Sequence, residues 1–191
     1  DMLKADLEKS IGSALTFTQD IGADIRVSID PAKVKRPQGF RIEVKPDGHL
    51  DICGHDSHGA AYGMLELSRL AGVSPWEWWA DATPEPSDRL FLPEGYVSEQ
   101  APDVEYRGIF VNDEDWGLMP WSSLHYEPSD IPGHIGPGTH ARIFELLLRL
   151  RANTYWPAMH ECTRPFFLDD ANRATAEKYG IYIGSSHCEP M

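Results

Sequence analysis

Short stretches of alternating apolar and polar residues mark strands in the first sixty positions of the chain. Residues 25–29 (IRVSI) and 40–44 (FRIEV) both alternate with a period of two, which is typical of strands with one buried face. Asp47-Gly48 predicts a tight primed turn, because these two residues accept positive φ angles, and the alternation then resumes over residues 50–52. The pattern predicts a strand followed by a β-hairpin.

The apolar spacing lengthens to three and four residues between Gly59 and Ala71. This spacing is typical of a helix with one buried face, and Gly72 supplies a stop at its C-terminus. Four prolines and a glycine then fall between residues 84 and 102, a composition that breaks regular structure and connects domains. We therefore predict an N-terminal accessory α/β domain with a Pro-rich linker over residues 1–100.

Strands alternate with helices in the second half of the chain. Apolar runs predict three strands, at residues 108–111, 154–156 and 181–183. A helix of about residues 140–151 separates the first two strands, and a helix that Asp169 or Asp170 caps and Gly180 closes separates the last two. Alternation of this kind predicts a parallel sheet built by right-handed crossovers.

A (β/α)₈ TIM barrel begins with this order of elements. A complete barrel needs at least about 200 residues, and only 91 follow residue 100. We therefore expect residues 101–191 to be the start of a catalytic barrel, with its first three βα units, in a truncated chain. An open three-stranded sheet is the alternative, but it would leave an apolar strand edge unprotected.

Polar and titratable residues follow each of the three predicted strands. In parallel α/β folds reactive groups gather at the carboxyl ends of strands, so these residues are candidates for one shared substrate-binding site: Asn112, Asp113, Glu114, Trp156, His187 and Glu189. Their carboxylates suit acid–base work or sugar hydroxyls. Alternatively, Asp113 caps a turn and Glu189 fixes a bend before Pro190.

Two triplets, His160-Glu161-Cys162 and His187-Cys188-Glu189, contain the side chains that ligate zinc. Neighbouring residues on a strand point to opposite faces, so neither triplet delivers all three groups to one ion without a bend. We therefore predict no metal. The long loop after the first of these strands carries Trp116 and Trp121, which are candidates either for flat contacts with sugar rings or for anchors of the loop itself.

Composition excludes several classes of partner. Lys and Arg number 17 and Asp and Glu number 30, so the net charge is −13, which disfavours nucleic acid and anionic membranes. No stretch approaches the ~20 apolar residues that cross a bilayer. Three cysteines are too few for a disulfide framework.

Four segments resemble glycoside hydrolase family 115, the xylan α-1,2-glucuronidases, in their order and spacing. They are YGMLELSRLAGVSPWEWWAD (62–81), YRGIFVNDE (106–114), FELLLRLRANTYWPAM (144–159) and YGIYIGSSHCEPM (179–191). The resemblance implies a small α/β domain before a (β/α)₈ barrel. It also implies release of glucuronic acid or its 4-O-methyl ether from xylan with inversion, and no metal or organic cofactor.

Residue roles implied by this resemblance concern sugar binding rather than catalysis. Asp113 is expected to line the sugar pocket, and Trp156, His187 and Glu189 match the motifs at the ends of the next two strands. The acid and base of the family are expected on later strands, so the catalytic residues are unknown. A uronate carboxylate needs a cationic or hydrogen-bonding clamp, for which the candidates are His160, Arg164 and His187.

The hypothesis is therefore an α-glucuronidase whose substrate is glucuronoxylan or an aldouronic acid. We expect the 191-residue chain alone to be inactive, and we allow for a homodimer of the full-length protein. A polysaccharide substrate favours a secreted or periplasmic location. The rivals are another two-domain glycosidase, such as a hexosaminidase-like enzyme, and a non-catalytic carbohydrate-binding module that uses its tryptophans.

Overall fold

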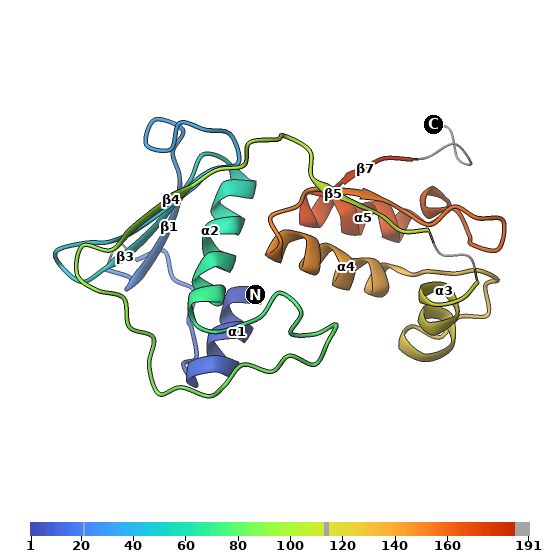
Figure 1. The fold of residues 1–191 in the computed structure, drawn as a ribbon, viewed down its shortest axis with the longest axis horizontal. Coiled ribbons are helices and arrows are strands. Elements are labelled where there is room, and N and C mark those ends of the chain that lie inside the picture. The colour runs from blue at the N-terminus through green and yellow to red at the C-terminus, as the bar shows by residue number, and fades with distance from the viewer. Residues whose placement is uncertain (21, 113–114, 186–191) are drawn as a thin grey trace. The chain divides into compact units, whose positions relative to one another are not determined.

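The computed structural model describes residues 1–20, 22–112 and 115–185. The chain is a mixed α/β protein that divides into two compact units, Asp1–Glu105 and Tyr106–Met191 (Figure 1). Across the described residues, no helix combines the length and the apolar character needed to cross a membrane.

The first unit is a four-stranded sheet with two helices. Its elements are α1 (Met2–Ile11), β1 (Ile25–Ile29), β2 (Phe40–Val44), β3 (Leu50–Gly54), α2 (Ser57–Leu70) and β4 (Val97–Gln100). The strand order is β1-β3-β2-β4, with β1 parallel to β3 and the other neighbours antiparallel. The three predicted strands and the predicted helix are confirmed.

Helix α2 packs closely on this sheet (Figure 1). Its buried Tyr62 and Leu67 join Ile42 of β2 and Ile52 of β3 in the core. Gly63 makes the close approach possible, because a Cβ there would lie 2.6 Å from Cγ2 of Ile52. Asp56 caps the helix by accepting a hydrogen bond from the backbone N–H of Gly59 at 2.9 Å, which satisfies one of the donors that a helix start leaves free.

The hairpin turn between β2 and β3 differs from the predicted primed turn. Only Gly48 has a positive φ, of 87°, and Asp47 does not. The backbone N–H of Gly48 donates to Lys45 O, and that of Lys45 donates to His49 O, so the loop is a three-residue turn. Pro46 explains the difference, because its fixed negative φ suits the first central position of a type I turn followed by a left-handed glycine.

The second unit is a three-stranded parallel sheet with two long helices. Its elements are β5 (Gly108–Phe110), α3 (Leu118–Trp121), a π-helical turn (Ser122–Tyr126), α4 (Pro137–Arg149), β6 (Thr154–Trp156), a 3₁₀ turn (Phe166–Leu168), α5 (Asp170–Tyr179) and β7 (Tyr182–Ile183). The strand order is β5-β6-β7 and both pairs are parallel. The predicted parallel pairing is confirmed.

One face of this sheet is covered by α4 and α5 (Figure 1). Tyr155 of β6 is fully buried there, and its ring meets Phe144 of α4 edge-on at 5.5 Å. Helix α4 begins at Pro137, three residues before the predicted start, because proline is well suited to the first helical turn. Asp169 is the cap of α5, and Gly180 ends that helix with a φ of 67°, both as predicted.

Candidate functional site

The carboxyl ends of β5, β6 and β7 lie side by side, as the sequence predicted. Phe110 is paired with Trp156, and Tyr155 is paired with Ile183. The ladder continues past the strands, since Val111 N donates to Trp156 O at 2.9 Å and Gly184 N donates to Tyr155 O at 3.0 Å. The segments that follow these strands therefore leave the sheet at one common edge.

Two of the six predicted site residues fall within the described part of the chain. Asn112 lies directly beyond β5 and is exposed, and Trp156 closes β6 with 42% of its surface exposed. The structure places both at the common edge. The other four, Asp113, Glu114, His187 and Glu189, lie outside the described residues.

An aromatic face covers the side of the sheet opposite α4 and α5. It consists of Tyr106, Phe110, Trp156 and Tyr182, which are each between 42% and 56% exposed. Phe110 and Trp156 meet edge-on at 6.1 Å between ring centroids, and Tyr106 and Tyr182 meet edge-on at 5.4 Å. Half-exposed rings of this kind offer flat apolar surfaces beside polar groups.

A thiol links the segments that follow β5 and β6. Cys162 is hydrogen-bonded to the carboxylate of Asp115, and this contact, together with burial of the thiol, raises the pKa of Cys162. Nδ1 of His160 lies 3.3 Å from the same sulfur. The thiol is thus a hydrogen-bond donor held in its neutral form, which is the opposite of what a nucleophilic cysteine requires.

Two side chains of the His160-Glu161-Cys162 triplet come together, although the sequence predicted that such neighbours would point to opposite faces of a strand. His160 and Cys162 lie in a turn rather than on a strand, so their side chains meet, with Nδ1 of His160 3.3 Å from the sulfur. Even so, the described residues contain no group of three or more His, Cys, Asp or Glu side chains placed to hold a metal ion.

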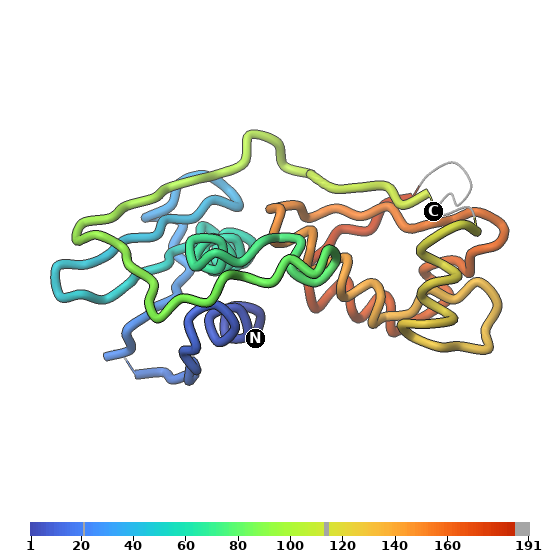
Figure 2. The backbone as a smooth tube through the Cα atoms, turned by 60° about the horizontal axis from the view of Figure 1, so that its bottom comes forward, coloured from blue at the N-terminus to red at the C-terminus, as the bar shows by residue number. Residues whose placement is uncertain are grey.

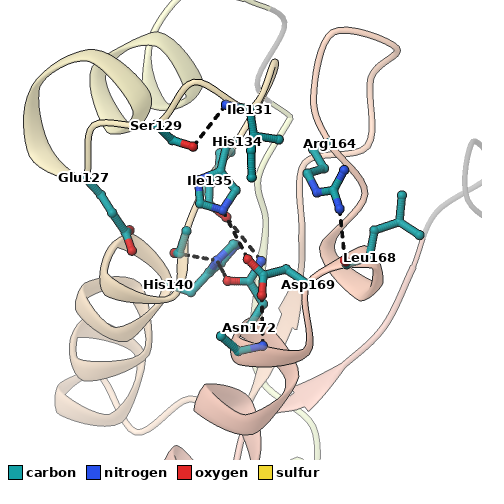
Figure 3. Close-up of polar contacts among 12 residues, drawn as sticks. Glu127, Ser129, Ile131, His134, Ile135, His140, Arg164, Leu168, Asp169 and Asn172 are labelled. Atoms are coloured by element: carbon teal, nitrogen blue, oxygen red, sulfur yellow. Dashed lines mark hydrogen bonds and ion pairs between the residues drawn. The ribbon is translucent and has the colours of Figure 1, made fainter.

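The loop between β5 and α4, whose backbone is traced in Figure 2, is held by a carboxylate at the start of α4 (Figure 3). Glu127 accepts hydrogen bonds from the backbone N–H groups of Gly138 and Thr139, at 3.1 and 3.0 Å, and from the Thr139 hydroxyl. Gly136, the cap residue itself, has no side chain to offer, and a Cβ there would lie 2.4 Å from the Glu127 carboxyl carbon. Glu127 is therefore a remote cap of α4.

The end of the same loop is fastened to the segments around α5 (Figure 3). Nε2 of His134 lies 3.1 Å from the Asp169 carboxylate, and this hydrogen bond lowers the pKa of Asp169. One residue earlier, Gly133 O accepts from Arg164 N at 2.9 Å. A Cβ on Gly133 would lie 2.1 Å from Cys162 O, so the loop after β5 rests directly on the loop after β6.

Sequence reasoning missed Glu127 and His134 as anchors of this loop. The Gly136-Pro137-Gly138 start of α4 has no capping side chain, and this is the one signal that indicates a cap supplied from elsewhere. No comparable local signal marks His134, because its partner lies 35 residues further along the chain.

The cationic side chains proposed as a uronate clamp are placed differently from one another. Arg164 donates from Nη2 to Leu168 O at 3.1 Å, so that contact holds its own loop (Figure 3). His160 is exposed beside Cys162. His187, the third candidate, is outside the described residues.

The two loop tryptophans have opposite environments. Trp121 stacks on Tyr126 with ring centroids 5.0 Å apart and only 6° between the planes. Trp116 is 92% exposed. Trp121 therefore anchors the loop, which is one of the two roles that the sequence allowed. The Trp116 ring, by contrast, is accessible for an intermolecular contact.

Comparison with known proteins identifies one family, and it also finds structures from other families that share the fold. The profile of glycosyl hydrolase family 115 matches residues 99–191. No curated protein matches. A solved structure described as a family GH115 4-O-methyl-alpha-glucuronidase with specificity for decorated arabinogalactans is 54% identical over 100% of this chain, with a TM-score of 0.95. The chain spans 27% of the length of that protein.

More distant solved structures share the fold alone. A mutant β-hexosaminidase from Streptomyces plicatus, in complex with GlcNAc, is 14% identical with a TM-score of 0.64, and the match covers 97% of this chain and 38% of that one. A GH138 enzyme targeting pectin rhamnogalacturonan II is 16% identical with a TM-score of 0.56, and the match covers 96% of this chain and 28% of that one.

Proposed function

Because this chain belongs to glycosyl hydrolase family 115, we propose that the whole protein is an α-glucuronidase that releases glucuronic acid or 4-O-methylglucuronic acid from a plant polysaccharide. The observation that carries the proposal is the 54% identity with a 4-O-methyl-alpha-glucuronidase along the full length of the chain. Identity at this level extends through both units, which supports a shared activity better than a shared fold does.

The second unit would supply the first three βα units of a (β/α)₈ barrel in this proposal. Barrel enzymes bind substrate at the carboxyl ends of their strands, and the parallel order β5-β6-β7 brings Asn112 and Trp156 to such an edge. We assign both to substrate binding, Asn112 through hydrogen bonds with hydroxyls and Trp156 through an apolar face. Asp113, Glu114, His187 and Glu189 are assigned to the same pocket from their positions in the sequence.

Inverting hydrolysis is the mechanism proposed for the whole protein. It requires a protonated acid at the leaving oxygen and a base that activates water on the opposite face, with the two carboxyl groups about 6.5–9.5 Å apart. Asp113 and Glu189 would bind hydroxyls or water beside such a pair. No step is assigned to a metal or an organic cofactor.

Two polysaccharides are candidates for the substrate. The motifs of the chain favour glucuronoxylan and its aldouronic acid fragments, whereas the 54% identical relative is specific for decorated arabinogalactans. The released uronic acid is the same in both cases, so the pocket for the uronate would be the same and the contacts outside it would differ. We propose an arabinogalactan as the first substrate to test.

The test is release of the free acid by the whole protein. We expect 4-O-methylglucuronic acid or glucuronic acid from one of the two polysaccharides, with the β-anomer appearing first in a proton NMR time course if the reaction inverts. The 191-residue chain alone should release none. Hydrolysis of aryl N-acetylglucosaminides instead would favour a hexosaminidase-like enzyme, and binding of polysaccharide without turnover would favour a non-catalytic module.

A further inference from the structure

The indole ring of Trp156 occupies the space that a side chain at position 184 would need. A Cβ on Gly184 would lie 2.1 Å from Nε1 and 2.4 Å from Cδ1 of that indole. Both distances are far below van der Waals contact, so any other residue at this position would force the ring to move.

Contact with the ring, rather than backbone conformation, is what requires a glycine here. Gly184 is not among the glycines with a positive φ, so an alanine would adopt its backbone without strain. Its backbone is fixed, because Gly184 N donates to Tyr155 O at 3.0 Å and so extends the ladder between β6 and β7. The glycine cannot withdraw to make room, and the indole would have to turn instead.

Phe110 holds the other side of the indole. The register of β5 and β6 pairs Phe110 with Trp156, and their rings meet at 63° with centroids 6.1 Å apart. The ring of Trp156 thus lies between Phe110 of β5 and the bare backbone of Gly184, with 42% of its surface still exposed. Its orientation is set by the strands on both sides.

We propose that Gly184 is a positioning residue for substrate binding, which acts by seating the Trp156 indole across the end of β7. This inference rests on the proposed function, because it assigns the seated ring to contact with a sugar. A flat aromatic ring binds the apolar face of a pyranose more tightly when its orientation is fixed beforehand, since ordering it on binding would cost affinity.

The inference predicts how the effect divides between binding and chemistry. Gly184 and Trp156 are apolar and neither transfers a proton, so Gly184→Ala should raise KM and leave kcat nearly unchanged. Loss of one aromatic contact corresponds to about a three- to tenfold rise in KM. Trp156→Ala should give a rise of the same size.

A double-mutant cycle on the whole protein tests the link between the two residues. If Gly184 acts through the ring, Gly184→Ala should have no further effect on KM in the Trp156→Ala background, because the group it displaces is gone. Glu177→Ala is the control, because Glu177 is an exposed residue on α5, and its replacement should leave KM unchanged. A rise in KM that is equal in both backgrounds would overturn the inference, and so would no rise in the wild-type background.

Folding of the variants gives a second measure of the same contact. Should Gly184→Ala fail to fold, the double variant with Trp156→Ala should fold, because removal of the indole removes the clash. Failure of the double variant would contradict the inference.

An NMR signal separates this inference from the proposed function. The indole Nε1–H resonance of Trp156, assigned by its absence in Trp156→Phe, should shift in Gly184→Ala and stay in place in Glu177→Ala. A protein that releases no uronic acid would refute the proposed function. The NMR shift would still test whether Gly184 sets the position of the Trp156 ring. An unmoved resonance in Gly184→Ala would refute the positioning role even in an active enzyme.

Discussion

Nδ1 of His140 lies 3.1 Å from Oδ1 of Asn172 and so joins α4 to α5 in the interior of the second unit. The same nitrogen lies 3.0 Å from Gly136 O. Asn172 is oriented by its own amide, which donates from Nδ2 to Ile135 O at 3.2 Å, so its oxygen faces the histidine (Figure 3). Both partners of Nδ1 are therefore acceptors, and the proton of the neutral imidazole must reside on Nδ1.

Stability is expected to fall as pH falls through the window set by this histidine. Burial lowers the pKa of His140 to about 4 from an ordinary value of 6.5. Between these two values the unfolded chain binds a proton that the folded chain does not, so stability decreases with pH from about 6.5 down to about 4. A shift of this size corresponds to about 3 kcal/mol. The check is the free energy of unfolding by urea at several pH values.

His140→Asn is the variant that isolates this contribution. An asparagine amide can donate near the position of Nδ1, but it does not titrate, so the variant should lose less stability than the wild type between pH 6.5 and pH 4. Contributions that the two proteins share cancel in the difference between their pH curves. Parallel pH curves for the two proteins would show that His140 is not the source.

Loss of the remote cap should destabilise α4. Glu127→Ala removes three hydrogen bonds at the start of that helix, and we expect it to cost about 1–3 kcal/mol of unfolding free energy. Glu127→Gln keeps an oxygen acceptor but loses the charge that favours a helix start, so its cost should be smaller. Denaturant unfolding measures both.

Glu177→Ala is the control for the cap variants. Glu177 is an exposed carboxylate on α5, and its replacement should change stability by less than about 0.5 kcal/mol. Equal costs for Glu127→Ala and Glu177→Ala would contradict the assignment of Glu127 as a cap.

Asp169 has two tasks that different substitutions separate. It caps α5 through Ala171 N at 2.9 Å and it pairs with His134 at 3.1 Å. Asparagine is also a good cap through its one side-chain oxygen, so Asp169→Asn should keep the cap and lose the carboxylate contact with His134. Asp169→Ala should lose both contacts and cost about 1–2 kcal/mol.

The unfolding free energy measured at acid pH separates the contact with His134 from the helix cap. The folded state lowers the pKa of Asp169, so its charge contributes stability above about pH 4 that is lost as pH falls further. Asp169→Asn should remove that part of the acid sensitivity. The neighbouring Asp170→Asn, which breaks only an exposed pair with Arg173, should change little; equal effects of the two substitutions would contradict the role of Asp169.

The sequence predicted correctly the elements that carry a regular pattern of apolar and polar residues along their own length. Residues 40–44 and 50–52 alternate between apolar and polar side chains and lie in β2 and β3, as expected. By contrast, β4 has the sequence VSEQ, in a segment predicted to be a linker, and it is a strand because its backbone pairs with β2. Helix α1 was also missed, since only Leu3 and Leu7 mark its buried side.

The sequence predicted which strand ends form the candidate site, but not the contacts that hold the loop around it. The parallel pairing that places Asn112 and Trp156 at one edge follows from alternating strands and helices. The contacts that hold the surrounding loop do not follow, because Glu127, His134 and Gly184 each act on a residue that only the folded chain brings near. Roles for Asp113, Glu114, His187 and Glu189 remain predictions.

The two loop tryptophans should respond differently to truncation. Trp121 stacks on Tyr126, and the Tyr126 hydroxyl in turn accepts a hydrogen bond from Arg142 Nε on α4 at 3.2 Å. Trp121→Ala removes this stacked ring, so we expect it to lower the unfolding free energy by about 1–3 kcal/mol. Trp116→Ala is the matched control, because its ring is 92% exposed and its loss should leave the melting temperature within a degree or so. The melting temperatures of the two variants distinguish a ring that anchors the loop from one that is free of it. A comparable fall in both melting temperatures would mean that Trp116 also supports the loop and is not available to a polysaccharide.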